Sequence, residues 1–300
     1  MKTIKVFSIL LIAICCRTIT AHAHYAEKIK TYTQSYPLQS NQVIKISNKF
    51  GKVVVNSWNR NEVKVEATII TSAKDERMAQ QLLDHINIES RAGTSITFTT
   101  RFSGSTARGK SSQSKMEVNY VIYMPSSNPL EIKNEFGNTF LPDWKGVIDI
   151  DQAFGELSVG SIANVKSIRV KFGGLNATAI HGGDIKISYS KLHIDKLTGT
   201  VSGKIDFCSG VHLGLHNALE KLDLKTSYSD IVCKIAPALD ATFQISTSYG
   251  DLKNLSGTEI VNQTREKRYG PTFDKSYKGV KGSGKVPVNI SASFGNITLK

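Results

Sequence analysis

The sequence predicts an all-β protein, a single-domain β-solenoid of stacked coils with an N-terminal cap that contains one amphipathic α-helix. Three observations lead to this class. An aromatic residue followed by a small residue recurs at nearly constant intervals, the residue types around each aromatic repeat from unit to unit, and two segments depart from the pattern. Repeats too short to bury a face alone become stable by stacking on their neighbours.

Residues 1–23 precede the repeats and have the pattern of a secretory signal peptide. Lys2 and Lys5 come before the apolar run Val6–Cys16, and Ala21-His22-Ala23 supplies a small-residue cleavage site. The apolar run is too short for a membrane anchor, which needs about 20 residues. We therefore expect export to the periplasm or the cell surface, with no transmembrane segment after cleavage.

Residues 24–135 are expected to form strands and a helix-containing cap. The stretch TSAKDERMAQQLLDHINIES has apolar residues every four positions, and Ser72, with Asp75 three residues later, is the expected helix N-cap. The alternating segments SITFTTRF and MEVNYVIYMP, which follow, are typical of strands. Such a cap would cover one end of the stack and prevent edge-to-edge association.

Nine aromatic residues mark the repeats. They are Phe50, Phe136, Phe154, Phe172, Tyr189, Phe207, Tyr228, Tyr249 and Phe294. From the second to the eighth, the intervals are 18, 18, 17, 18, 21 and 21 residues. The residue four before the aromatic is aliphatic in eight repeats of nine, the next residue after the aromatic is always small, and the third after it is usually aliphatic.

This spacing predicts which side chains point inward. The aromatic and the residue four before it share strand parity, so both are expected in the core. The third residue after the aromatic has the opposite parity, and a bend at the small residue, with glycine at positive φ, would turn it inward again. Residues 136–300 would then stack as coils about 4.8 Å apart. An immunoglobulin-like sandwich, the competing fold, has no reason to keep residue types in register over so many units.

The regular spacing is interrupted at residues 264–285, which separate Tyr249 from Phe294 by 45 residues and indicate a loop or hairpin inserted in the last coil. Cations alternate with aromatics there, a composition that suits a glycan or a phosphate. The candidate anionic-ligand site comprises Arg265, Lys267, Arg268, Tyr269, Lys275, Lys278, Lys281 and Lys285. A solvated charged loop is the competing interpretation.

The chain is basic, and removal of Lys2, Lys5 and Arg17 with the signal peptide lowers its formal charge from +13 to +10. Such a charge attracts anionic partners. We expect an anionic glycan or envelope polymer, or another envelope protein, whereas export makes nucleic acid a poor candidate. Two outward columns also carry charge: Lys133, Asp151, Arg169, Lys186, Lys204 and Lys225 beside Glu131, Asp149, Ser167, Asp184, Ser202 and Asp223. A cationic track for an anionic polymer is one interpretation of these columns. The other, which the mixed charges favour, is that carboxylates interleaved with the cations neutralise them.

Catalytic, cofactor and metal sites are not indicated. Asp149 and Asp151 have the spacing that glycoside hydrolysis needs, but the repeat makes them ordinary members of the charged columns. The histidines form no zinc-binding motif. About 13 Å of strand separates the columns of Cys208 and Cys233, which is too far for a disulfide, so two buried free thiols are expected.

The order of elements resembles a known family. The segments VIKISNKFGKVVVNSWNRNEVKVEA and VNYVIYMPSSNPLEIKNEFGNTFL, with the final VNISASFGNITLK, are similar to exported bacterial β-solenoid proteins catalogued as putative adhesins, formerly a domain of unknown function. The resemblance covers nearly the whole mature chain and implies a non-catalytic, adhesin-like protein of the bacterial cell envelope. A periplasmic structural or envelope-stress scaffold and a polysaccharide-acting β-helix enzyme are the alternatives.

Overall fold

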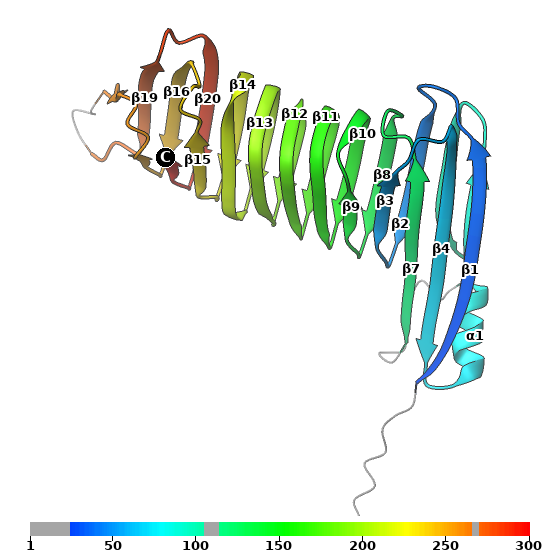
Figure 1. Ribbon diagram of the computed structural model, residues 1–300. Helices are drawn as coiled ribbons and strands as arrows, with labels where there is room; N and C mark the ends of the chain where they lie inside the picture. The colour runs from blue at the N-terminus through cyan, green and yellow to red at the C-terminus, as the bar shows by residue number, and fades with distance from the viewer. Residues whose placement is uncertain (1–24, 105–113, 266–269) are drawn as a thin grey trace, which may run out of the picture.

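The computed structural model describes residues 25–104, 114–265 and 270–300. Within these ranges the chain is nearly all β, with one α-helix, and hydrogen bonds join its strands into a single 21-stranded sheet. The strands lie side by side in a long row (Figure 1). The predicted all-β class with one helix is therefore confirmed. The predicted signal peptide, residues 1–23, lies outside the described residues.

The N-terminal part combines long antiparallel strands with the helix. It comprises β1 (Ala26–Pro37), β2 (Val43–Lys49), β3 (Val53–Ser57), β4 (Glu62–Ala73), α1 (Glu76–Asp84), β5 (Ile86–Arg91), β6 (Ser95–Phe102) and β7 (Lys115–Met124). Strand β4 pairs antiparallel with both β1 and β7. These three strands extend beyond the row beside α1 (Figure 1).

The helix begins three residues later than the sequence predicts. Ser72 still belongs to β4, where it pairs with residues of both neighbouring strands. Asp75 is the N-cap instead, and its carboxylate accepts a hydrogen bond from the Met78 N–H at 2.8 Å. The helix then buries Ala79, Leu82 and Leu83. Strand pairing thus overrides the capping preference of Ser72.

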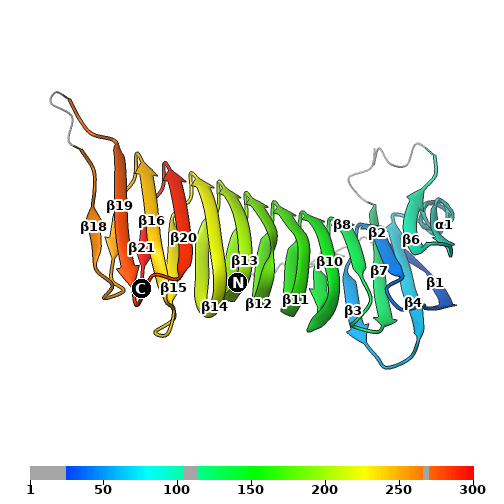
Figure 2. The same cartoon turned by 90° about the horizontal axis from the view of Figure 1, so that it is seen from above.

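The middle of the row consists of parallel strands whose register follows the sequence repeat. These are β8 (Leu130–Glu135), β9 (Thr139–Leu141), β10 (Trp144–Ala153), β11 (Glu156–Lys171), β12 (Gly174–Ser188), β13 (Lys191–Asp206) and β14 (Ser209–Ser227). From β10 to β14, each strand pairs in parallel with the next, so that Ile150 lies opposite Ile168, and Ile168 opposite Ile185. Equivalent residues of successive repeats therefore lie opposite one another on neighbouring strands, and Figure 2 shows these strands side by side along the row.

The C-terminal part leaves sequence order. Its strands are β15 (Ile231–Ile235), β16 (Ala241–Ser248), β17 (Leu252–Asn254), β18 (Ile260–Asn262), β19 (Asp274–Lys281), β20 (Val286–Ser293) and β21 (Ile297–Leu299). Strand β20 lies between β14 and β16 and pairs in parallel with both. Strand β19 pairs antiparallel with β16 and β18. The predicted insertion therefore contributes a strand of a hairpin, and the repeat of Phe294 is not the last one in space.

The expected inward position of the aromatics is wrong. Eight of the nine rings are between 44% and 54% exposed, whereas the aliphatic residues four before and three after them, such as Ile150 and Leu157, are buried. The aromatic itself has a positive φ, between 49° and 60° in all nine repeats. This left-handed residue reverses the strand parity and turns its own ring outward. The residue two before it, such as Gln152, points into the core instead.

The small residue after the aromatic is required for close backbone approach and not for a positive φ. At Gly155, a Cβ atom would lie 2.2 Å from the carbonyl oxygen of Gly137 in the preceding repeat. Where serine takes this place, its hydroxyl is used in the contact between repeats: the Gly173 N–H donates to Ser190 Oγ at 3.1 Å. The corner therefore brings the backbones of successive repeats together.

Cys208 and Cys233, the two cysteines among the described residues, are free and buried, as expected. Cys208 occupies the small-residue position of its corner, and its thiol donates to the Asp206 carbonyl oxygen at 3.3 Å. Burial raises the pKa of the Cys233 thiol to about 12. Both thiols therefore pack as small apolar groups.

Gly155→Ala should destabilise the protein by about 1–3 kcal/mol, because the added methyl group meets a backbone carbonyl that cannot move without its neighbours. Gly174→Ala is the matched control, since the atom nearest to its Cβ would be Glu156 Cγ at 3.7 Å. Urea unfolding followed by circular dichroism measures both changes. Equal free energies of unfolding for the two variants would contradict the role assigned to the corner.

Candidate functional site

The nine aromatic rings form one continuous stack along the outside of the corners. Neighbouring ring centroids are 4.6–5.2 Å apart, with planes inclined by 16° or less. Phe102 contacts Phe50 edge-on at one end, and Phe273 stacks on Tyr249 at the other. Each ring covers the face of the next, so the rings of the column expose edges. The column therefore stabilises the corners and offers no free ring faces on which sugars could stack.

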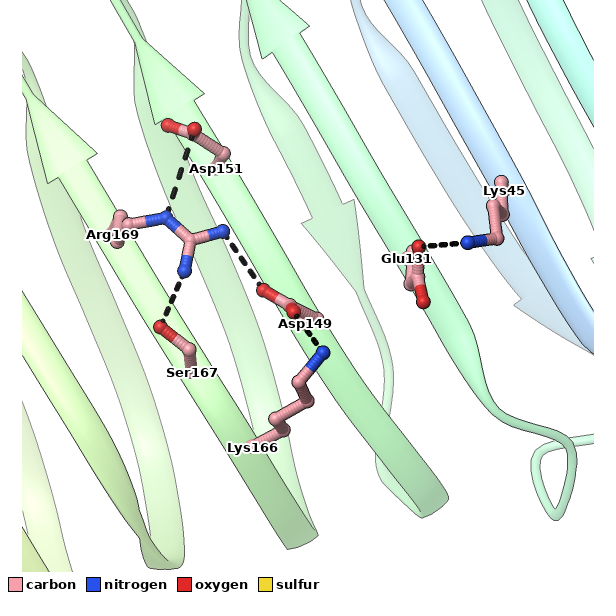
Figure 3. Close-up of polar contacts among 7 residues, drawn as sticks. All are labelled: Lys45, Glu131, Asp149, Asp151, Lys166, Ser167 and Arg169. Atoms are coloured by element: carbon pink, nitrogen blue, oxygen red, sulfur yellow. Dashed lines mark hydrogen bonds and ion pairs between the residues drawn. The ribbon is translucent and has the colours of Figure 1, made fainter.

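The charged columns neutralise each other in the N-terminal half of the row, as predicted. Arg169 Nη2 lies 2.9 Å from Asp149 Oδ1, and Arg169 Nε lies 3.6 Å from Asp151 Oδ2. Lys166 contacts the other Asp149 oxygen at 2.9 Å, and Lys45 contacts Glu131 at 2.8 Å. Figure 3 shows how the guanidinium group bridges two strands. This half of the face is a mixed ionic network.

The Asp149 carboxyl is held in its charged form. Burial alone would raise its pKa, but the hydrogen bond from Lys166 and the charges of Arg169 and Lys166 outweigh burial and lower the pKa below its usual value. A glycosidase needs one carboxylic acid that is protonated near neutral pH. Asp149 is therefore ion-paired, as an ordinary member of the charged columns would be, and the spacing of Asp149 and Asp151 does not by itself make a catalytic pair.

The predicted anionic-ligand residues are only partly brought together. Arg265 and Lys275 line one open hollow of about 380 Å³ over β16, β19 and β20. We call it the terminal hollow; its other lining residues include Ser246, Ser276, Ser291 and Ser293. Lys275 is also ion-paired with Asp251. Hydroxyl groups and two cations thus converge on one surface, together with the Asp274 carboxylate, which also lines the hollow.

The other predicted residues lie elsewhere. Lys278 is exposed on β19, the Lys281 ammonium group donates to the Pro237 carbonyl oxygen at 2.5 Å, and the Lys285 N–H donates to Asp240 Oδ1 at 3.2 Å. The two lysines beyond Lys278 therefore take part in the turn contacts at the end of the hairpin. Lys267, Arg268 and Tyr269 lie outside the described residues.

The serines of the terminal hollow were not predicted. Ser246 and Ser291 occupy the position three before the aromatic, where five of the seven earlier repeats carry cations, and their hydroxyl oxygens lie 3.0 Å apart. The change from cation to serine was visible in the sequence columns. The order of the two repeats on either side of the insertion was not, because it depends on the placement of β20 between β14 and β16.

A larger hollow, about 860 Å³, lies at the other end of the row. Phe50, Phe136 and Phe140 form part of its lining, together with Lys52, Lys115, Glu27 and Glu117. Its cations and carboxylates balance, so it lacks the positive charge that an anionic partner needs.

Within residues 25–104, 114–265 and 270–300, no three histidine, cysteine or acidic side chains are grouped as metal ligands. The described helix is too short to cross a lipid bilayer.

Comparisons with known proteins give structural likenesses alone. No family model matches the sequence, and no curated protein does. A solved structure from Bacteroides fragilis, described as a putative adhesin, is 11% identical with a TM-score of 0.40 and covers 90% of this chain and 97% of its own. A putative adhesin from Parabacteroides distasonis is 13% identical, with a TM-score of 0.38 and coverage of 90% and 97%.

A third solved structure, a putative cell adhesion protein from Clostridium sporogenes, is 15% identical, with a TM-score of 0.24 and coverage of 91% of this chain and 99% of its own. These three structures are thus bacterial and are described as putative adhesins or as a putative cell adhesion protein. Their identities and TM-scores are too low to support a function for this chain.

Asp149→Asn should lower stability near neutral pH by about 1–2 kcal/mol, since it removes a carboxylate that binds two cations. A lowered folded-state pKa contributes stability that is fully present above the unfolded pKa and is lost as pH falls through the folded pKa. The difference between variant and native protein should therefore shrink below about pH 4. Thermal unfolding across this range checks it, with the exposed Asp84→Asn as control. A difference that is constant with pH would contradict the assignment.

Proposed function

We propose that the protein is an exported, non-catalytic β-solenoid of the cell envelope that binds an anionic glycan or a similar anionic envelope polymer, in the manner of an adhesin. The terminal hollow is the observation that carries this proposal, because it joins Arg265 and Lys275 to a surface of serine hydroxyls. Guanidinium and ammonium groups bind sulfate, phosphate or carboxylate, and hydroxyls exchange hydrogen bonds with sugar hydroxyls.

The parallel pairing of β10 to β14 in one-repeat register supports the β-solenoid part of the proposal. Residues 136–300 would form its coils, and residues 24–135 would cap it, although the first repeat, at Phe50, joins the same aromatic stack. The basic charge of the chain adds a general attraction to polyanions. A polymer would thus meet side chains that project from a backbone already held in place by strand pairing.

The binding test uses point substitutions, since deletion of residues 264–285 would remove β19 and expose the β16 edge that it covers. The purified protein is expected to bind dextran sulfate and not neutral dextran. Arg265→Gln with Lys275→Gln should weaken that binding roughly tenfold at low salt, because two charge contacts are lost.

Lys234→Gln with Lys253→Gln is the matched control: it removes the same charge from exposed positions on β15 and β17, away from the hollow. Equal losses in the two double variants would show attraction to net charge alone and would contradict the site. Absence of binding to dextran sulfate and to other acidic glycans would favour the scaffold alternative. Release of reducing ends from an acidic glycan such as polygalacturonate would identify an enzyme.

A further inference from the structure

A straight row of outward side chains leads from the middle of the sheet to the terminal hollow. Its members are Lys186 on β12, Lys204 on β13, Lys225 on β14, Ser291 on β20, Ser246 on β16 and Ser276 on β19, and each is the register partner of the next. All six are exposed. Because neighbouring strands lie about 4.8 Å apart, the five steps of this lysine–serine row span roughly 24 Å.

The three lysines of the row are only weakly neutralised. Within the described part of the chain, neither Lys186 nor Lys225 has a carboxylate oxygen within 4.0 Å, and Lys204 has one, Asp206 Oδ2, at 3.2 Å. Like charges directly opposite one another on neighbouring strands destabilise a sheet. The ionic network that relieves this repulsion around Arg169 stops one strand before Lys186. An anionic ligand bound over Lys186, Lys204 and Lys225 would relieve the repulsion among these lysines.

The surface between these lysines is hollowed. A depression of about 450 Å³ is lined by Lys186, Lys204 and Lys225, with Ser202, Gly203 and Asp223. Ser202 stands between two aspartates of its column, Asp184 and Asp223, and its shorter side chain leaves room above the Gly203 backbone.

The acidic neighbours leave this depression positive. The Asp223 carboxylate accepts from Asn289 Nδ2 at 2.7 Å and is paired with Lys221 at 2.7 Å, so its charge is already engaged. Asp206 is the partner of Lys204. Asp184 lies beside Ser202 at the margin of the depression. Three cations thus converge on the depression, with Asp223 the carboxylate in its lining.

From these contacts we propose that the ligand is a linear polyanion that lies across the strands along the lysine–serine row, from Lys186 to the terminal hollow. Its anionic groups meet the three lysines at one end and Arg265 with Lys275 at the other, and the serines between them receive its hydroxyls. This inference rests on the proposed function and extends it: it gives the ligand a direction, a length of at least roughly 24 Å, and a chemistry of closely spaced sulfate, phosphate or carboxylate groups.

The decisive variant is Lys186→Gln with Lys204→Gln and Lys225→Gln. Its matched control is Lys45→Gln with Lys133→Gln and Lys166→Gln, which removes the same charge from lysines that are paired with Glu131, Glu135 and Asp149. Binding of dextran sulfate is measured by calorimetry over a range of salt concentrations. The row variant should lose at least about tenfold in affinity, and the slope of log affinity against log salt should fall by roughly two units, whereas the control slope should stay close to that of the native protein.

Folding is monitored by thermal unfolding. The row variant should unfold at the native temperature or above it, because three opposed charges have gone, whereas the control loses ion pairs. A row variant and a control that lose affinity equally would overturn the proposal.

Chain length gives a second, independent test. Size-graded dextran sulfate fragments should bind the native protein more tightly as their length increases, until a fragment spans both the lysine-lined depression and the terminal hollow. The second contact then becomes intramolecular. Inorganic sulfate should compete weakly. If the Arg265 and Lys275 double variant weakens binding while the row variant binds long and short fragments as the native protein does, this inference fails and the proposed function stands. If neither variant weakens binding, both fail.

Discussion

The close approach of backbones at each corner is the constraint on which the rest of the structure depends. A residue with positive φ is followed by a residue with little or no side chain, and the carbonyl group of one repeat nearly touches the Cα atom of the next. The inward residue two before the aromatic often completes the corner: the Asn134 amide donates to the Gly137 carbonyl oxygen at 3.2 Å, and Thr247 Oγ1 donates to that of Gly250 at 2.9 Å. These hydrogen bonds give a donor to corner carbonyl groups that lie outside the hydrogen-bond ladder between strands.

Alignment at the corner carries over to the outward positions of the strand segment that leads into it, whereas register shifts interrupt it elsewhere along the strands. Since corners stack without offset, equivalent residues face each other across about 4.8 Å, and any residue type that recurs becomes a row. A row of aromatics gains stacking energy, whereas a row of cations gains repulsion. A row of cations is treated in two ways in this chain. Around Arg169, carboxylates from the same column and from the adjacent one pair with it, and over β12 to β14 the lysines stay exposed. This difference places the least neutralised positive charge on the surface over β12 to β14.

Periodicity in the sequence was sufficient for the all-β class, the repeat length and the position of the insertion, because each depends on the spacing of residue types along the chain. Periodicity gave the wrong side for the aromatic rings, because alternation of inward and outward side chains assumes an uninterrupted strand. Phe154, like its equivalents, adopts the left-handed conformation and interrupts the strand. Periodicity also placed the helix cap at Ser72, where pairing with β1 and β7 keeps the backbone extended. Arg265 and Lys275 were identified by composition, but their serine partners depend on long-range pairing that one sequence does not reveal.

The placement of β20 connects the fold to the proposed site. If the repeats followed chain order, the neighbour of Lys225 would be Ser246 on β16. With β20 between β14 and β16, Ser291 is the partner of both Lys225 and Ser246. The long connection through β18 and β19 then closes the edge of β16 and brings Arg265 and Lys275 over these serines. The insertion is therefore better explained as the segment that makes this strand exchange feasible than as a loop added to a finished stack, and its cations come to lie in line with the lysine–serine row.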